Sequence, residues 1–205
     1  DSADGQLARA KQQYSRRGRF LDSIGDFVVD VAIFGAIGWV FFSSTGEWRM
    51  IVLSVLGLLG ITLRVSYHVF YQTSFLHLDE QYQFNRVTEA ITRNDLEGDP
   101  VALRLQNLFQ IIYGWQDSLM LRLDLWCRRG RTERDFLSRW YSDPKGLRLS
   151  GLVGFGTELF LLMICSVFNE LSLYLFLNVF LMSGIVMVSV FYRRWYLSAV
   201  LQAKG

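Results

Sequence analysis

The sequence is poor in proline, cysteine and histidine, and its charges nearly balance. Two prolines among 205 residues, with no linker rich in glycine, serine and proline, favour a single domain over 1–205 with one insertion at 74–148. Cys127 and Cys165 stand in segments of different character, which favours two reduced thiols over a disulfide. His68 and His77 form no zinc motif. A net charge of +2 gives no sign of a nucleic-acid partner, and no signal peptide is visible at the start.

Apolar residues dominate the composition instead. They make up 51% of the chain, 15% of it is aromatic, and the mean hydropathy is positive, which is too apolar for an ordinary soluble domain. A helix from Arg19 to Phe42 would have 24 residues and a length of about 36 Å, enough to cross a bilayer. We therefore predict an all-α bundle of transmembrane helices. Complete or partial crossings are expected at Arg19–Phe42, Met50–Leu63, Leu149–Phe168 and Leu171–Tyr192.

Basic residues are distributed unevenly around these segments. The stretch 74–148 holds eleven Lys and Arg, whereas the two short loops assigned to the opposite side hold a single arginine, Arg49. This pattern places 74–148 in the cytoplasm as a helical insertion. Its helices are expected at 76–93, at 100–129 after an Asp99 cap, and at 132–141. An apolar stripe, expected to dock on the bundle in preference to a second subunit or the membrane surface, comprises Leu103, Leu105, Leu108, Ile111, Ile112 and Trp115.

Four carboxylates fall within the first 26 residues, in two pairs. Asp1 and Asp4 are three residues apart and Asp22 and Asp26 are four apart, a spacing that puts each pair on one face of a helix. Two such helices facing each other would gather four negative charges, which need cations because like charges oppose ionisation at contact distance. Mg²⁺ or Mn²⁺, which prefer oxygen ligands and phosphate substrates, suit such a site. A solvated acidic helix end is the simpler alternative, but it leaves the first pair unexplained.

The residues between the acids suit a phosphate ligand. Gly5, Ala8 and Gly18 have little or no side chain, so a ligand can approach the backbone closely. Arg9 is a planar, doubly donating partner for phosphate. The whole string reads D-x2-D-G-x2-A-R-x8-G-x3-D-x3-D without a mismatch. It resembles the signature of the CDP-alcohol phosphotransferase family of integral membrane enzymes, also called CDP-alcohol phosphatidyltransferases.

The resemblance implies an enzyme of phospholipid biosynthesis. Such an enzyme transfers a phosphoryl-alcohol group, phosphatidyl in our first choice, from a CDP-linked donor such as CDP-diacylglycerol to an acceptor alcohol and releases CMP. The implied ligands of two divalent cations are Asp1, Asp4, Asp22 and Asp26. Asp26 would also be the general base that takes the proton of the acceptor hydroxyl. The implied nucleotide-binding residues are Asp1, Gly5, Ala8, Arg9, Gly18 and Asp22.

The resemblance also sets expectations for the whole protein. It implies a bundle of about six helices integral to the cell inner membrane or an equivalent one, with the active site facing the cytoplasm. A homodimer is expected on the same ground. The chain begins on the first Asp of the signature, so we expect it to lack the N-terminal part of the bundle.

Polar residues beyond the signature are weaker candidates. Asp30, one turn beyond Asp26, is interpreted equally as support for a metal ligand or as a buried acid paired with Arg64. Glu158 is a candidate for binding the acceptor, since polar groups within membrane helices normally face the bundle interior. Arg64, near a cytoplasmic helix end, is a candidate for binding the acceptor's phosphate in preference to an ordinary interfacial arginine, because Tyr67 and His68 are close to it in the sequence. Asn178 lies within an apolar helix too, as part of the site or of a helix–helix hydrogen bond.

Two arginines near the end of the last crossing could bind the acceptor's phosphate, but a plainer interpretation is preferred for them. Arg193 and Arg194 are expected to be ordinary interfacial arginines, whose charged ends reach water while their stems cover apolar surface.

Three other activities compete with the preferred one. Transfer from a small CDP-linked alcohol to a lipid acceptor would use the same site, and no signature residue distinguishes glycerol phosphate, inositol or its phosphate, serine and diacylglycerol as acceptors. A prenyltransferase should carry two acidic motifs far apart in the sequence, whereas here all four acids lie within 26 residues. A non-enzymatic, ion-binding transporter should show interrupted helices in two related halves, and no such symmetry is visible.

Overall fold

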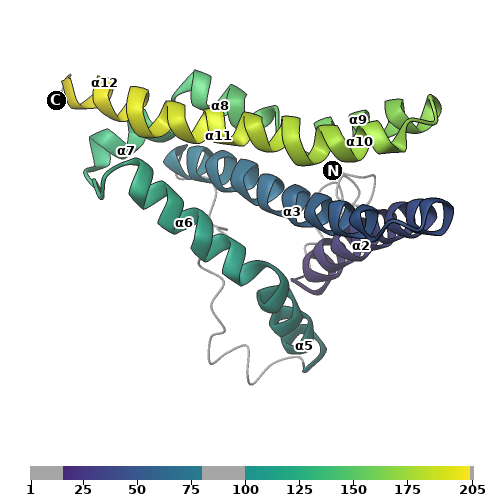
Figure 1. The fold of residues 1–205 in the computed structure, drawn as a ribbon. Helices are drawn as coiled ribbons and strands as arrows, with labels where there is room; N and C mark the ends of the chain where they lie inside the picture. The colour runs from purple at the N-terminus through teal and green to yellow at the C-terminus, as the bar shows by residue number, and fades with distance from the viewer. Residues whose placement is uncertain (1–15, 80–99, 204–205) are drawn as a thin grey trace.

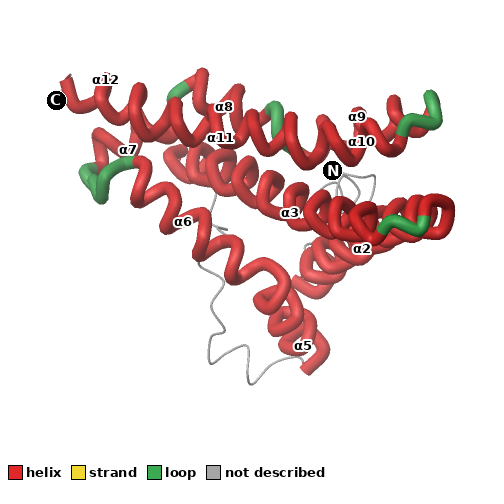
Figure 2. Tube along the Cα trace, viewed as in Figure 1, coloured by secondary structure: helices red, strands yellow, loops and turns green. Residues whose placement is uncertain are grey.

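The computed structural model describes residues 16–79 and 100–203, and every regular element in these ranges is helical (Figures 1 and 2). The helices are α2 (Arg16–Thr45), α3 (Trp48–Leu76), the 3₁₀ turn η1 (His77–Asp79), α5 (Pro100–Phe109), α6 (Trp115–Cys127), α7 (Arg134–Tyr141), α8 (Pro144–Gly151), α9 (Phe155–Val167), α10 (Leu171–Phe176), α11 (Ser183–Phe191) and α12 (Ser198–Ala203). Three π-helical stretches join consecutive helices: η3 (Gln110–Gly114), η4 (Leu177–Met182) and η5 (Tyr192–Leu197). The predicted all-α class is confirmed.

Four helical stretches of the described chain are long and apolar enough to cross a membrane. They are Phe20–Thr45, Trp48–Leu76, Pro144–Val167 and Leu171–Leu201. The protein is therefore a polytopic membrane protein, as predicted. In Figure 1, α2 and α3 form a helical hairpin, and the rod from α10 to α12 runs along α3, with α8 and α9 beside it.

The first crossing ends at Thr45, three residues beyond the predicted end. The hydroxyls of residues 43–45 donate hydrogen bonds to the carbonyls of Val40 and Phe41. These carbonyls already accept backbone amides within the helix, and the Gly46 amide closes the last turn by donating to the Phe42 carbonyl at 2.8 Å. Gly46, with φ +71°, then turns the chain back toward α3.

The third crossing begins earlier than predicted, at Pro144. The Asp143 carboxylate accepts a hydrogen bond of 2.6 Å from the Gly146 amide and caps the helix, and proline is well suited to the first helical position. The chain then breaks between α8 and α9 at residues 152–154. A Cβ on Gly154 would lie 3.1 Å from Cδ2 of His68, so this break lets α3 approach closely.

The helices predicted for the insertion are found only in part. The predicted helix 100–129 is present as α5, η3 and α6, and 132–141 is present as α7. The predicted helix 76–93 lies outside the described residues except at 76–79, and so does the Asp99 cap. Three residues of the apolar stripe that was expected to dock on the bundle are half-buried, Leu103, Leu105 and Ile112, and three are exposed, Leu108, Ile111 and Trp115. The stripe is only partly covered, because the helix turns Gln106 and Phe109 most fully toward its neighbours.

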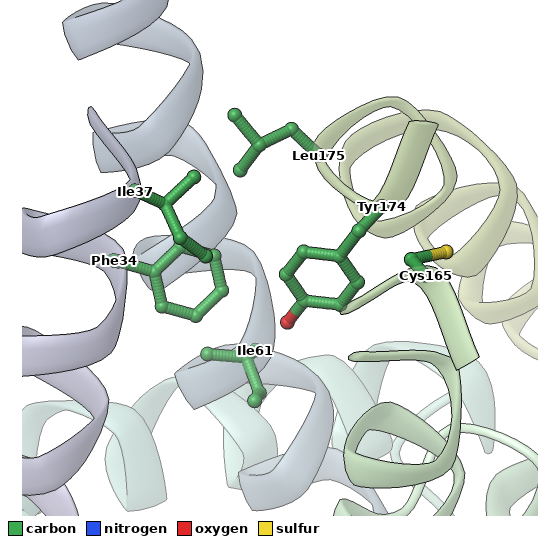
Figure 3. Packing of buried hydrophobic residues seen from close by; sticks show 6 residues of the cluster. All are labelled: Phe34, Ile37, Ile61, Cys165, Tyr174 and Leu175. Carbon is green, nitrogen blue, oxygen red and sulfur yellow. The ribbon is translucent and has the colours of Figure 1, made fainter. Parts of the chain in front are cut away.

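The membrane helices meet around a small apolar core. Figure 3 shows its six buried side chains, which come from α2, α3, α9 and α10: Phe34, Ile37, Ile61, Cys165, Tyr174 and Leu175. Cys165 and Cys127 are both free and buried, as predicted for reduced thiols. Burial, with a smaller contribution from the nearby Asp124, raises the pKa of the Cys127 thiol to about 12, so this thiol is unreactive at neutral pH.

Asp124, in α6, is a fully buried carboxylate that holds three helices together. Its Oδ1 accepts hydrogen bonds from the Tyr71 hydroxyl at 3.1 Å and the Trp140 indole N–H at 2.9 Å. Its Oδ2 accepts from the Tyr141 hydroxyl at 2.8 Å and from Nε of Arg128 at 3.0 Å. Because the donors lie on α3, on α7 and at Arg128 directly after α6, the carboxylate joins the two insertion helices to a membrane helix. No sequence pattern distinguishes this acid, since acids are common in polar insertions.

We expect Asp124→Ala to destabilise the protein by about 3–5 kcal/mol, because it leaves the Arg128 charge and three neutral donors buried without their acceptor. Thermal unfolding of the purified protein in detergent measures this loss. Asp135→Ala is the matched control, since Asp135 is an exposed acid in α7. An Asp124→Ala protein that unfolds at the temperature of the control would contradict the assignment.

Candidate functional site

The described part of the acidic signature lies on the first turns of α2. Gly18, Asp22 and Asp26 are all exposed, and their four-residue spacing places them on one face of the helix. The opposite face is packed: Phe20 is only 1% exposed. The structure therefore brings these three predicted residues together on a surface that the other described residues leave open.

The other five signature residues precede this face in the chain. Asp1, Asp4, Gly5, Ala8 and Arg9 lie outside the described residues. In the ranges that the structure describes, no group of three or more His, Cys, Asp and Glu could hold a metal ion.

Asp22 and Asp26 nevertheless fit a hard divalent cation in their chemistry. Both offer carboxylate oxygens, the donors that Mg²⁺ and Mn²⁺ prefer, from adjacent turns of one helix. They supply half of the four carboxylates that the signature implies, and α2 holds them in a fixed relation to each other.

Asp30 continues this line of acids one turn deeper and is half-buried. Its electrostatic neighbours are Asp26 on the exposed side and Glu158 on the buried side. It therefore lies between the acidic face and a buried polar network. The alternative that pairs Asp30 with Arg64 is wrong, because Arg64 binds Glu158 instead.

The buried network joins α3, α9 and η4 inside the membrane-spanning part. Nε of Arg64 donates to Glu158 Oε1 at 2.7 Å, and Nη2 lies 2.5 Å from the same oxygen. Nη1 of Arg64 donates to the Asn178 carbonyl at 3.0 Å and to the Ser183 hydroxyl at 3.3 Å. The Asn178 amide donates to Glu158 Oε2 at 2.8 Å.

Arg64 and Glu158 are thus each other's partners, with 3% and 1% of their surface exposed. Asn178 makes the helix–helix hydrogen bond that was one of its two interpretations. Contact of Arg64 or Glu158 with an acceptor stays a prediction, and it requires the pair to open.

Arg193 differs from the expectation of an interfacial arginine. It is fully buried, and its guanidinium lies over the Tyr71 ring at 3.6 Å from the ring centroid. Nη1 donates to the Trp140 carbonyl at 3.4 Å. The expectation is wrong because the last crossing does not end at Tyr192: the helix continues through η5 and α12, which turns Arg193 into the protein.

Arg194 remains closer to the expectation. Its guanidinium lies over the Trp126 ring at 4.7 Å from the centroid, and Nη1 donates to the Trp126 carbonyl at 3.1 Å, at the exposed side of α6. The two neighbouring arginines therefore have different surroundings, which their adjacent positions in the sequence do not reveal.

The acidic face begins α2, and the apolar remainder of α2 forms a hairpin with α3. Residues 1–80 match the model of the CDP-alcohol phosphatidyltransferase family. The match contains the whole acidic signature and both helices of the hairpin. The resemblance drawn from the signature is confirmed.

The family match indicates a transferase that acts on CDP-linked alcohols in a membrane. Residues 81–205, which include α5 to α12, lie outside the matched stretch. No curated protein and no solved structure matches the chain.

Proposed function

We propose that the protein transfers the phosphatidyl group of CDP-diacylglycerol to a small polar or phosphorylated alcohol and releases CMP, as a step of phospholipid biosynthesis. The supporting observation is the exposed face of α2, where Gly18, Asp22 and Asp26 stand in the register of the signature. This face belongs to the stretch that matches the CDP-alcohol phosphatidyltransferase family.

The reaction breaks the phosphoanhydride bond of the CDP-linked donor and forms a phosphate ester bond to the acceptor alcohol. Asp26 accepts the proton of the acceptor hydroxyl as the acceptor oxygen forms a bond to the lipid-linked phosphorus. The bond from this phosphorus to the bridging oxygen breaks, and CMP leaves with the electron pair. Asp1, Asp4, Asp22 and Asp26 would hold two divalent cations, Mg²⁺ or Mn²⁺, which would supply positive charge against the pyrophosphate. Asp26 works best as a base if it is held slightly away from them, because cations lower the pKa of a carboxylate.

The other signature residues position the donor. Gly5, Ala8 and Gly18 leave room for the cytidine and its phosphates close to the backbone, and Arg9 holds the diphosphate. Arg64 and Glu158 are proposed to contact the acceptor when their pair opens. The electrostatic neighbourhood of Glu158 and Asp30, and of Asp30 and Asp26, supports this role.

The orientation and assembly of the protein complete the proposal. The eleven Lys and Arg of residues 74–148, against a single arginine in the two short opposite loops, support an active site that faces the cytoplasm of an inner membrane or its equivalent. A homodimer is proposed from the family resemblance.

An assay of CMP release tests the proposal. The purified full-length protein is incubated with CDP-diacylglycerol and, in separate reactions, glycerol phosphate, inositol, inositol phosphate or serine, under Mg²⁺ or Mn²⁺. A further reaction contains a small CDP-linked alcohol with diacylglycerol. We expect CMP release with one of these acceptors. Release only from a small CDP-linked alcohol with diacylglycerol would establish the second candidate, and no release with any pair would remove the transferase assignment.

A further inference from the structure

The insertion contacts the helix that carries the acids. α5 and η3 lie against the first turns of α2, at the lower end of this helix in Figure 1. The Phe109 ring of α5 packs on the Phe20 ring of α2 with 5.3 Å between the centroids. Both side chains are buried, Phe20 at 1% exposure and Phe109 at 6%.

Tyr113, in η3, makes the polar contact of this interface. Its hydroxyl donates a hydrogen bond of 2.8 Å to the backbone carbonyl of Ser23. Its ring lies edge-on to the Phe27 ring at 6.4 Å and packs on the Phe109 ring at 5.0 Å. Within residues 100–114, the insertion therefore holds α2 by the Tyr113 hydrogen bond and by a continuous group of aromatic rings.

The contacted residues of α2 alternate with the acids along the chain. Ser23 directly follows Asp22, and Phe27 directly follows Asp26. At about 100° per residue, Phe20, Ser23 and Phe27 lie within about 60° of one another around α2, and the centre of the two acids lies roughly 110° away. The insertion thus packs on the face next to the acids, which stay exposed.

The π-helical stretch Gln110–Gly114 explains how one helical segment reaches two neighbours. An extra residue in a turn rotates the following side chains by about 100° about the helix axis. α5 can therefore face α2, while α6 faces α3, where Asp124 accepts the hydrogen bond of Tyr71. The buried contacts of α6 with α3 anchor the segment that holds α2.

We propose that α5 and η3 position the metal-binding end of α2, with Tyr113 as the positioning residue. This inference rests on the proposed function, and it assigns a role in that function to residues 100–114, which lie outside the stretch that matches the family. By holding Ser23 and Phe27, the insertion fixes the rotation of α2 and hence the direction of the Asp22 and Asp26 carboxylates.

The test compares Tyr113→Phe with the unsubstituted protein in two measurements. The first is Mn²⁺ binding to the purified full-length protein, followed by the loss of the paramagnetic resonance of free Mn²⁺. The second is CMP release as a function of Mn²⁺ concentration. In Tyr113→Phe we expect half-saturation to require roughly threefold to tenfold more Mn²⁺ in both measurements, as the loss of one hydrogen bond implies. Excess Mn²⁺ should restore the rate of CMP release. The unfolding temperature should equal that of the control variant.

Ile111→Ala is the matched control, because Ile111 belongs to the same turn and is 73% exposed. Unchanged Mn²⁺ half-saturation in Tyr113→Phe would overturn the inference about Tyr113 and leave the proposed function standing. An equal shift of half-saturation in Ile111→Ala would also overturn the inference about Tyr113. An unsubstituted protein that binds Mn²⁺ but releases no CMP would refute the proposed function. The Mn²⁺-binding measurement alone would then show whether Tyr113 positions the metal-binding residues of α2. Absence of Mn²⁺ binding in the unsubstituted protein would refute both.

Discussion

Asp26→Asn is expected to lower the rate of CMP release by roughly 10²- to 10⁴-fold, the range that a general base contributes. The amide has nearly the shape of the carboxylate but does not accept the proton of the acceptor hydroxyl. Because Asp26 is exposed, its replacement leaves the packed face of α2 intact, and the protein should fold and enter the membrane normally.

The measurement combines CMP release with nucleotide binding. We expect CMP release to be lost while binding of CDP-diacylglycerol persists, because the other signature residues still hold the nucleotide. Glu47→Gln serves as the control, since Glu47 is an exposed acid beyond the opposite end of α2 and should retain full activity. An Asp26→Asn protein with unreduced turnover would show that another group takes the proton.

Removal of one partner of the buried Arg64–Glu158 pair is expected to cost about 3–5 kcal/mol of stability. Glu158→Leu leaves a guanidinium without its anion at a place where 3% of the Arg64 surface is exposed. Arg64→Met leaves the Glu158 carboxylate in the same situation, with the Asn178 amide as its remaining hydrogen-bond donor. Both single variants should therefore unfold at clearly lower temperatures.

The double variant Arg64→Met with Glu158→Leu distinguishes a lost pair from damaged packing. Because it removes both charges together, we expect it to recover most of the stability lost by either single variant. Thermal unfolding in detergent measures all three, with Glu170→Gln at an exposed turn as the control. Full additivity of the two single losses would mean that the pair contributes no coupling, and the network would then not hold α3, α9 and η4 together.

The expected loss of turnover in Asp26→Asn and the expected loss of stability in the Arg64 and Glu158 variants distinguish exposed from buried polar groups in this protein. Asp26 is exposed on the acidic face, and its change should affect turnover. Arg64 and Glu158 are buried in the bundle, and their change should affect folding first. Asp30 lies between them, so its environment depends on both parts.

The acidic face and the membrane class could be predicted from residues close together in the chain. The four-residue spacing of Gly18, Asp22 and Asp26 determines that they share a side of α2, because a helix repeats every 3.6 residues. Long apolar runs likewise determine membrane-spanning helices, since a bilayer requires that the backbone satisfy its own hydrogen bonds. Helix ends were less predictable, because hydroxyls and caps such as Asp143 shift them by a few residues.

The partners of the buried charges were decided by the tertiary structure alone. Arg64 binds Glu158, 94 positions away, instead of the nearer Asp30, and Arg193 lies over the Tyr71 ring instead of reaching water. The contact of Tyr113 with Ser23 likewise joins positions 90 apart. Local spacing predicts the face of a helix on which a side chain stands. Which neighbour that face meets depends on how the whole bundle buries its charges with the fewest unpaired groups.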